Sequence, residues 1–357
     1  MLADGTKYDS CNSTTTCHTW TPDGRCIQLY KTLLTNVCSG ECLYCPNRCE
    51  RDATRASLEP DEIVKITWDF YRRNAIEGLF LSSGVMGDPE YTTQRQLEVL
   101  RALRDSGFAG YVHVRLMPGV PRDMIREVSL LANKFGVNAE TTCQSRYDEI
   151  CPSFDYNNDI LRRMGWTFDA VKRRRSEVRY GEGIVGANDT QFVVGATSEP
   201  DREIIETVDR FREAYGLRRP FFMSFDPVPG TPLSEARASP LWREVRLYQM
   251  SYLLKDYGLR YRDLELALDD AGFLPDEDPK LVLARLHRDA FPVDVNVAPY
   301  AELIRVPGIG PRTANRIVRG RPVLDYRQLA AMGAVLKRAR PFIVVAGRRQ
   351  ADLGAFT

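Results

Sequence analysis

The strongest constraint on the fold is a long alternation of strand-like and helix-like segments. From about residue 28 to residue 260, short β-branched or apolar runs alternate with longer amphipathic runs. Such alternation predicts strand–helix units that build a parallel sheet. The expected strands are residues 27–34, 78–83, 110–117, 136–142, 191–197 and 220–226. Six strands of this kind fit either a partial barrel or an open doubly wound sheet, and periodicity does not separate the two.

Length and punctuation predict the domain organisation. A chain of 357 residues exceeds the usual size of one compact domain, so we expect a large domain and a smaller one. The large α/β domain is placed at residues 28–268, the stretch 269–280, rich in Pro, Gly and Asp, is a linker, and residues 281–357 form a small all-α domain. Residues 1–27 are expected to be an irregular extension that carries cysteines.

Composition excludes several classes of protein. Hydrophobic residues make up 43% of the chain and charged residues 27%, as in ordinary globular proteins. The first residues have no apolar export signal, and no stretch reaches the roughly 20 apolar residues that span a bilayer, so we expect a cytoplasmic protein with no membrane partner. Seven of the nine cysteines lie in the first 49 residues. In a reducing cytosol, clustered cysteines are metal ligands more often than disulfides.

The stretch VCSGECLYCPN, residues 37–47, holds three cysteines with C-x3-C-x2-C spacing directly after the first expected strand. On a loop at the carboxyl end of a barrel strand, Cys38, Cys42 and Cys45 can bind three irons of a 4Fe-4S cluster and leave the fourth iron open. An open iron binds a substrate or cofactor, whereas a structural zinc site uses four ligands. Cys49 could supply a fourth ligand, so a zinc knuckle is the alternative.

This loop resembles the cysteine motif of the radical SAM superfamily, in which an aromatic residue, here Tyr44, precedes the last cysteine. The resemblance implies a partial (β/α)6 barrel of the TIM type. It also implies that the open iron binds S-adenosylmethionine, and that Cys38, Cys42 and Cys45 are both the cluster ligands and the catalytic centre. Reductive cleavage of that cofactor gives methionine and a 5'-deoxyadenosyl radical, which takes a hydrogen atom from the substrate.

Later strand ends supply cofactor-binding candidates. Ser82, Ser83 and Gly84 follow the second expected strand, where the superfamily has a motif that meets the methionyl amine, although its glycine pair is only partly present here. Asn138 and Glu140 share one face of the fourth expected strand and suit a ribose or a carboxylate.

Two other strands add candidates. On the third expected strand, His113 and Arg115 point to one face. Arg115 is a candidate for the cofactor carboxylate or a substrate anion, whereas His113 is expected to be a buried histidine satisfied by a neighbour. Gly195 belongs to a fifth strand that is similar to the adenine-contacting strand of the superfamily.

The remaining cysteines leave three alternatives open. Cys11, Cys17 and Cys26 lie in a polar stretch with loose spacing, which suits a second metal centre, with Cys49 or His18 as a fourth ligand. That centre could be an auxiliary iron-sulfur cluster or a zinc site, or the cysteines could be unliganded. The two later cysteines are expected to be thiols and not ligands; they are Cys143 and Cys151.

The C-terminal region carries a second sharp pattern, VPGIGPRTANRIV at residues 306–318. Gly308 and Gly310 permit a tight turn from which a helix starts, as in the hairpin of a helix-hairpin-helix motif. Such a turn binds phosphate oxygens through backbone N–H groups. Residues 301–350 carry eleven Arg and Lys against two acidic residues, while the whole chain has a net charge of +1. We therefore expect DNA-backbone contacts from Gly308, Gly310, Arg312, Thr313 and Arg316, with protein contact as the alternative.

Over about residues 8–345 the chain resembles the DNA modification or repair radical SAM proteins, which join such a barrel to a C-terminal helix-hairpin-helix. The shared stretches are HTWTPDGRC, FYRRNAIEGLFLSSGV and FPVDVNVAP followed by LIRVPGIGPRTA. The resemblance implies a nucleic-acid substrate, and we expect a base in DNA to be modified or repaired, for instance a C5-substituted pyrimidine that becomes a hypermodified thymine. An electron donor such as flavodoxin or ferredoxin is the implied protein partner. The alternatives are a tRNA-modifying enzyme and a non-catalytic iron-sulfur protein that binds DNA and senses redox state.

Overall fold

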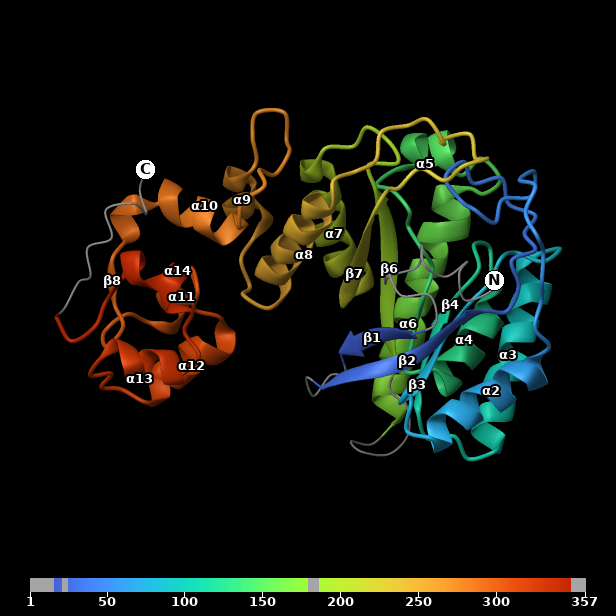
Figure 1. Cartoon of the computed structure of the whole chain (residues 1–357), viewed down its shortest axis with the longest axis horizontal. Helices are drawn as coiled ribbons and strands as arrows, with labels where there is room; N and C mark the ends of the chain where they lie inside the picture. Colours follow the sequence, from blue (N-terminus) through green and yellow to red (C-terminus); the bar gives the residue numbers. More distant parts are fainter. Residues whose placement is uncertain (1–15, 21–24, 179–185, 348–357) are drawn as a thin grey trace. The chain divides into compact units, whose positions relative to one another are not determined.

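The computed structural model describes residues 16–20, 25–178 and 186–347 (Figure 1). The chain divides into two compact units, one of residues 1–199 with 210–244 and one of residues 200–209 with 245–357. Among the described residues, no helix combines the length and the apolar character needed to cross a membrane.

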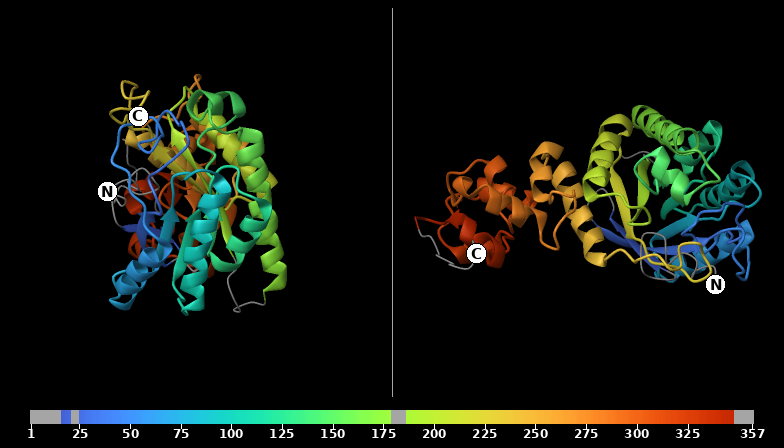
Figure 2. Two further views of the ribbon diagram at one scale, coloured as in Figure 1. Left: turned by 90° about the vertical axis from the view of Figure 1, so that its right-hand side faces the viewer. Right: turned by 90° about the horizontal axis from the view of Figure 1, so that it is seen from above.

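The first unit is built on one seven-stranded sheet in which the strands follow one another in chain order. β1 pairs antiparallel with β2, and every later pairing is parallel. The sheet curls, and Figure 2 shows the helices on its outer side. This order confirms the partial (β/α)6 barrel and excludes the doubly wound sheet. The strands are β1 (Thr16–Trp20), β2 (Cys26–Leu33), β3 (Gly78–Ser82), β4 (Tyr111–Arg115), β5 (Lys134–Gly136), β6 (Ala187–Val194) and β7 (Arg219–Ser224).

A helical segment follows each parallel strand, and both faces of the sheet are buried. On β4, Val112 and Val114 face one side and His113 and Arg115 the other, and each is at most 3% exposed. Polar side chains therefore fill part of the barrel interior. The helices are α2 (Pro60–Arg72), α3 (Pro89–Asp105), α4 (Arg122–Leu131), α5 (Gln144–Ile150), α6 (Arg162–Glu177), α7 (Asp201–Tyr215) and α8 (Leu241–Lys255), with a π-helical segment at Tyr156–Leu161 before α6.

The fourth parallel strand differs from its prediction, because β5 ends at Gly136 and was expected at residues 136–142. After that residue, the Thr190 hydroxyl donates to Val137 O at 2.8 Å and accepts from Ala139 N at 2.9 Å, in place of ladder hydrogen bonds. Pairing resumes where Glu140 N donates to Gln191 O at 2.8 Å. The β5 side thus contains one residue more than the β6 side, which is the geometry of a β-bulge.

The N-terminal extension is not wholly irregular, which corrects that prediction. Residues 16–20 form β1, and Cys17 is buried against Ile27, Leu29 and Phe80. Alternation of buried Cys17 and Thr19 with exposed His18 is the period-two signal of a strand. The strand was not predicted because most residues in this stretch are polar.

The second unit begins earlier than the small domain that we expected. Asp201 Oδ2 accepts from Leu274 N at 2.9 Å, and Arg202 N donates to Gly272 O at 2.9 Å, so the expected linker is bound to the start of α7. A single apolar cluster, which includes Ile309, Ile317 and Phe342, forms the core. The unit contains α9 (Tyr261–Leu264), α10 (Pro279–Leu286), α11 (Tyr300–Leu303), α12 (Pro311–Arg319), α13 (Tyr326–Ala331) and α14 (Leu336–Ala339), and one short parallel pair, β8 (Val293–Asp294) with β9 (Ile343–Val344).

Candidate functional site

A pocket lies at the carboxyl ends of the parallel strands of the first unit, where barrel folds carry their sites. It receives residues from the loops or ends of all six parallel strands. It brings together the cysteine triplet and all but one of the expected cofactor-binding residues. These are Cys38, Cys42, Tyr44, Cys45, Ser82, Ser83, Gly84, Arg115, Asn138 and Glu140.

The cysteine loop is bound to the end of β3 by backbone hydrogen bonds. Ser39 N donates to Val85 O at 2.8 Å, and Gly84 N donates to Thr35 O at 2.8 Å. A Cβ on Gly84 would lie 2.4 Å from Val37 O, a separation that real atoms do not adopt. Glycine at this position therefore lets β3 approach the cysteine loop, which explains the residue without any contact to a cofactor.

Arg55 joins the two ends of the cysteine loop. Its Nη1 donates to Asn36 O at 2.6 Å and to Asn47 O at 2.9 Å. Its Nη2 donates to Arg48 O at 2.6 Å and to Arg51 O at 3.0 Å. One guanidinium thus binds four carbonyl oxygens, one before the three cysteines and three after them. These hydrogen bonds hold the loop in place without a metal.

We expect Arg55→Lys to weaken retention of a metal centre by the loop by about tenfold or more. A lysine reaches fewer of the four carbonyls, and each hydrogen bond from a charged donor contributes about 1.5–3 kcal/mol. Iron per chain after anaerobic reconstitution and gel filtration measures this. The matched control is Arg73→Lys, at an exposed position at the end of α2. Equal iron in the two variants would show that Arg55 does not position the loop.

Two of the three sulfurs accept backbone hydrogen bonds of a kind that suits thiolate ligands. Cys38 Sγ accepts from Gly40 N and from Val85 N, each at 3.3 Å, and Cys45 Sγ accepts from Asn47 N at 3.4 Å. Burial raises the pKa of Cys38 and, more strongly, that of Cys45. For Cys42, a hydrogen bond with the Cys151 side chain raises the pKa, and burial adds to this. Binding of a metal must therefore release protons from these thiols.

The alternative of a zinc knuckle has no support among the described residues. In the part of the chain that the structure describes, no three His, Cys, Asp or Glu side chains converge to hold a single metal ion. Cys49 is exposed and does not line the pocket. Cys38, Cys42 and Cys45 instead surround a common space, which fits a multi-atom cluster held by three ligands.

The auxiliary metal centre has less support. Cys11 lies outside the described residues. Cys17 is buried in the sheet, while Cys26 is exposed at the start of β2. The other expected ligands, His18 and Cys49, are exposed. The second cluster therefore stays a prediction. The described candidate ligands do not come together as a group that could hold a metal ion.

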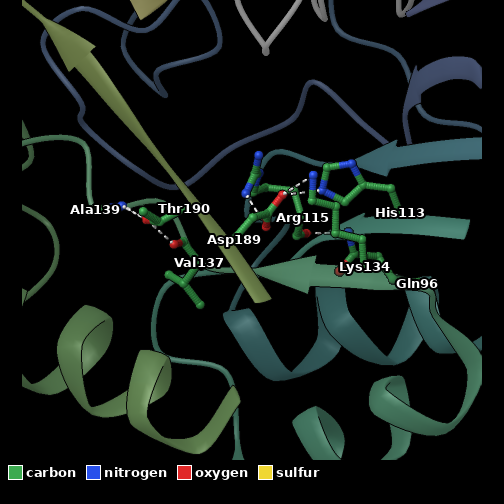
Figure 3. A network of polar contacts seen from close by, with 8 residues as sticks. All are labelled: Gln96, His113, Arg115, Lys134, Val137, Ala139, Asp189 and Thr190. Carbon is green, nitrogen blue, oxygen red and sulfur yellow. Dashed lines mark hydrogen bonds and ion pairs between the residues drawn. The ribbon is translucent and has the colours of Figure 1, made fainter. Parts of the chain in front are cut away.

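Beneath the pocket, Asp189 of β6 holds three cationic or titratable side chains (Figure 3). Arg115 Nη1 lies 3.0 Å from Asp189 Oδ1, and Lys134 Nζ lies 3.6 Å from Oδ2. His113 Nε2 lies 2.8 Å from Oδ2 but is not aligned as a hydrogen bond. His113 is thus buried beside a polar neighbour, as expected from the sequence, but no hydrogen bond from the described residues satisfies its Nε2.

Burial and charge set the protonation of this group. Burial alone would raise the pKa of Asp189, but Arg115, His113 and Lys134 outweigh it and hold that pKa far below its ordinary value. Burial lowers the pKa of His113 to about 4, so His113 is neutral at pH 7. Burial also lowers the pKa of Lys134 to about 8, with Asp189 opposing the shift. Two cations therefore face one carboxylate.

Arg115 connects this group to the pocket. Its side chain is almost fully buried and lines the pocket, yet Nε and Nη2 have no hydrogen-bond partner among the described residues. Asn138 Oδ1, also in the lining, is buried in the same way. Buried donors without partners are costly unless a ligand completes them. Nearby Glu140 has a φ of 61°, a strained backbone conformation of the kind found at binding sites.

Gly195 does not line the pocket. It has a φ of 86°, its N–H donates to Glu199 Oε1 at 2.7 Å, and a Cβ would lie 2.9 Å from Ser239 Cβ. Its glycine is thus explained by a turn after β6. Sequence reasoning missed other lining residues that alternate along the strands, where pattern alone does not tell pocket from core; these include Gln191, Val193, Met223, Phe225 and Asp226.

The second unit contains the expected hairpin. Gly308 has a φ of 83°, and a Cβ would lie 2.6 Å from Val335 O. α12 begins at Pro311, and the N–H groups of its first turn have no partner within the helix. Arg312 and Arg316 are exposed, although Arg316 Nη1 donates to Met332 O at 3.2 Å. Thr313 is buried and donates to Gly333 O at 3.1 Å, so it holds the unit together.

Comparison with known proteins supports the hairpin directly. Residues 289–335 match the family model of the helix-hairpin-helix motif. No curated protein sequence matches the chain. The helix-hairpin-helix motif that was predicted around Gly308 and Gly310 is therefore confirmed.

Three solved structures that are similar to the chain cover between 58% and 63% of it. The FeFe-hydrogenase maturase HydG from Carboxydothermus hydrogenoformans is 16% identical, with a TM-score of 0.49 over 63% of this chain and 51% of that one. Methylornithine synthase PylB is 16% identical, with a TM-score of 0.48 over 63% and 60%. The radical S-adenosylmethionine methyltransferase TsrM from Kitasatospora setae is 14% identical, with a TM-score of 0.40 over 58% and 38%. The match thus spans about two fifths to three fifths of each of these chains.

Proposed function

We propose that this protein is a radical SAM enzyme that modifies or repairs a base in DNA. The observation that carries the proposal is the common pocket of Cys38, Cys42 and Cys45 at the carboxyl ends of a partial barrel. Three thiols with C-x3-C-x2-C spacing, with no fourth cysteine among the described residues of the lining, suit a 4Fe-4S cluster with one open iron. Cys49 then has no part in that cluster.

The pocket residues fit S-adenosylmethionine beside such a cluster. Arg115, with buried Nε and Nη2 facing no protein acceptor, suits the carboxylate, and Asn138 Oδ1 suits a donor such as the amine or a ribose hydroxyl. Ser82 and Ser83 add hydroxyls in the same wall. Reductive cleavage of the bound cofactor would supply a 5'-deoxyadenosyl radical, and the role of the protein is to hold that cofactor and exclude water.

The nucleic-acid substrate is inferred from the second unit. Its helix-hairpin-helix match, the exposed Arg312 and the N–H groups at the start of α12, which have no partner within that helix, suit a phosphate backbone. Because a barrel pocket is enclosed, a duplex base would have to leave the stack to reach it. A C5-substituted pyrimidine is the substrate that we favour within this class, and an electron donor such as flavodoxin or ferredoxin would reduce the cluster.

The test is anaerobic reconstitution, reduction with dithionite and assay of 5'-deoxyadenosine from S-adenosylmethionine. Parallel reactions contain duplex DNA, single-stranded DNA, tRNA or no nucleic acid, and nucleosides are then analysed by mass spectrometry. We expect cofactor cleavage in all reactions and a mass change only with DNA. A change confined to tRNA would replace DNA as the substrate. No cleavage by a chain fully loaded with iron would refute the enzyme proposal.

A further inference from the structure

Lys280, on α10, contacts the hairpin from outside the matched motif. Its side chain is buried, with the residue 8% exposed. Nζ donates to the backbone oxygen of Ile309, between the two hairpin glycines, at 2.5 Å, and lies 4.7 Å from the centre of the Tyr257 ring. A long cationic side chain thus ends at the tip of the turn that is expected to bind phosphate.

The surroundings of Lys280 do not balance its charge. Nζ makes no ion pair within the described residues. The nearest acid in sequence, Asp278, accepts from Lys280 N at 3.0 Å through Oδ1 and from Arg338 Nη1 at 2.9 Å through Oδ2. Burial lowers the pKa of Lys280 to about 7, and Asp278 opposes that shift. This buried amine contacts a carbonyl and an aromatic ring but no carboxylate among the described residues. An added anion would therefore stabilise its charged form.

Lys280 also shares a groove with the hairpin. The groove wall includes Gly308, Gly310 and the exposed Arg312. The other charged or titratable groups that line it are Asp256, Tyr257, Asp278 and Arg338. Burial raises the pKa of Tyr257, so that phenol stays neutral near pH 7. Lys280 is therefore a group in this lining that can change charge near neutral pH.

We propose that Lys280 positions the hairpin and supplies a buried cation to a nucleic-acid phosphate in this groove. The inference rests on the proposed nucleic-acid function of the second unit and adds a residue outside residues 289–335. The ligand class is the phosphodiester, and the contact is independent of base sequence.

The sign of the pH dependence follows from linkage. A phosphate next to Lys280 favours the protonated amine, so the complex binds more protons than the free protein at and above neutral pH. Affinity for a duplex should therefore fall as the pH rises from about 7 to about 8.5, by up to about tenfold per pH unit for one proton. Below about pH 6 the amine is charged in both states and its contribution to the slope disappears.

The experiment measures binding of a labelled duplex to the full chain by fluorescence anisotropy at low salt, between about pH 6 and about pH 8.5. Lys280→Arg keeps a charge that does not titrate, so we expect tight binding with a flattened pH profile. Lys280→Met should bind more weakly at pH 6, also with a flat profile. His287→Gln removes the nearest histidine in sequence and should keep the wild-type slope. Circular dichroism verifies that each variant is folded.

Two results would overturn the inference while leaving the proposed function intact. The first is duplex binding by the wild-type chain with no slope between pH 7 and pH 8.5. The second is a Lys280→Arg profile as steep as that of the wild type, a comparison that remains decisive if Lys280→Met does not fold. Absence of any duplex binding by the folded wild-type chain would refute the nucleic-acid function itself, and this inference with it.

Discussion

Replacing Cys38, Cys42 or Cys45 by alanine is expected to abolish cleavage of S-adenosylmethionine and to remove the iron that the loop retains. Three thiolates leave one of the four irons open, so the loss of any one leaves two irons without a protein thiolate. All three cysteines line the same pocket, and the backbone already holds the loop through Ser39 and Gly84. The measurements are iron per chain and 5'-deoxyadenosine per chain.

Cys49→Ala is the matched control, because Cys49 lies on the same loop but is exposed and outside the pocket lining. It should keep wild-type iron and wild-type cleavage. Loss of iron in Cys49→Ala equal to that in the other three variants would restore the four-ligand site as the better account. Iron that survives in the triple alanine variant would instead indicate a second centre.

The site was predictable where its residues are close in the chain. Cys38, Cys42 and Cys45 follow one strand, so their spacing alone placed them on one loop, and Gly308 and Gly310 likewise define one turn. Chain order of the strands then brought the expected residues to a single edge, because the carboxyl ends of parallel strands meet there. The sequence was compatible with a partial barrel but did not distinguish it from an open doubly wound sheet, because a strand pattern does not determine how a sheet curls.

The groups that hold the site were not predictable, because their partners are distant in sequence. Arg115 and Asp189 are 74 residues apart, and Lys280 and Ile309 are 29 apart. Neither pair leaves a periodic signal. The bulge between β5 and β6 depends on one hydroxyl, that of Thr190, which propensity does not distinguish from any other strand threonine. Long-range pairing of polar residues is the information that single-sequence reasoning lacks.

Asp189→Asn is expected to lower the free energy of unfolding by about 3–5 kcal/mol at pH 7, the usual cost of removing one partner from a buried charge pair. The amide keeps the shape of the side chain but leaves Arg115 and Lys134 facing each other in a buried site without a carboxylate. Chemical denaturation measures the change. Asp169→Asn removes an exposed acid 3.3 Å from Arg122 and should cost about 0–1 kcal/mol.

The pH dependence separates lost charge from lost packing. In the wild type, the pKa of Lys134 is about 8, below that of an unfolded lysine. Without Asp189 the pKa of Lys134 in the folded state falls further. The folded variant therefore loses the Lys134 proton at a lower pH than the folded wild type does, while the unfolded chain still holds that proton. Stability of Asp189→Asn should then rise between about pH 6.5 and about pH 8, a range over which the wild type gains little from this group. A difference between the two proteins that stays constant across this range would mean that shape and hydrogen bonding, and not the buried charge of Asp189, hold Arg115 in the pocket wall.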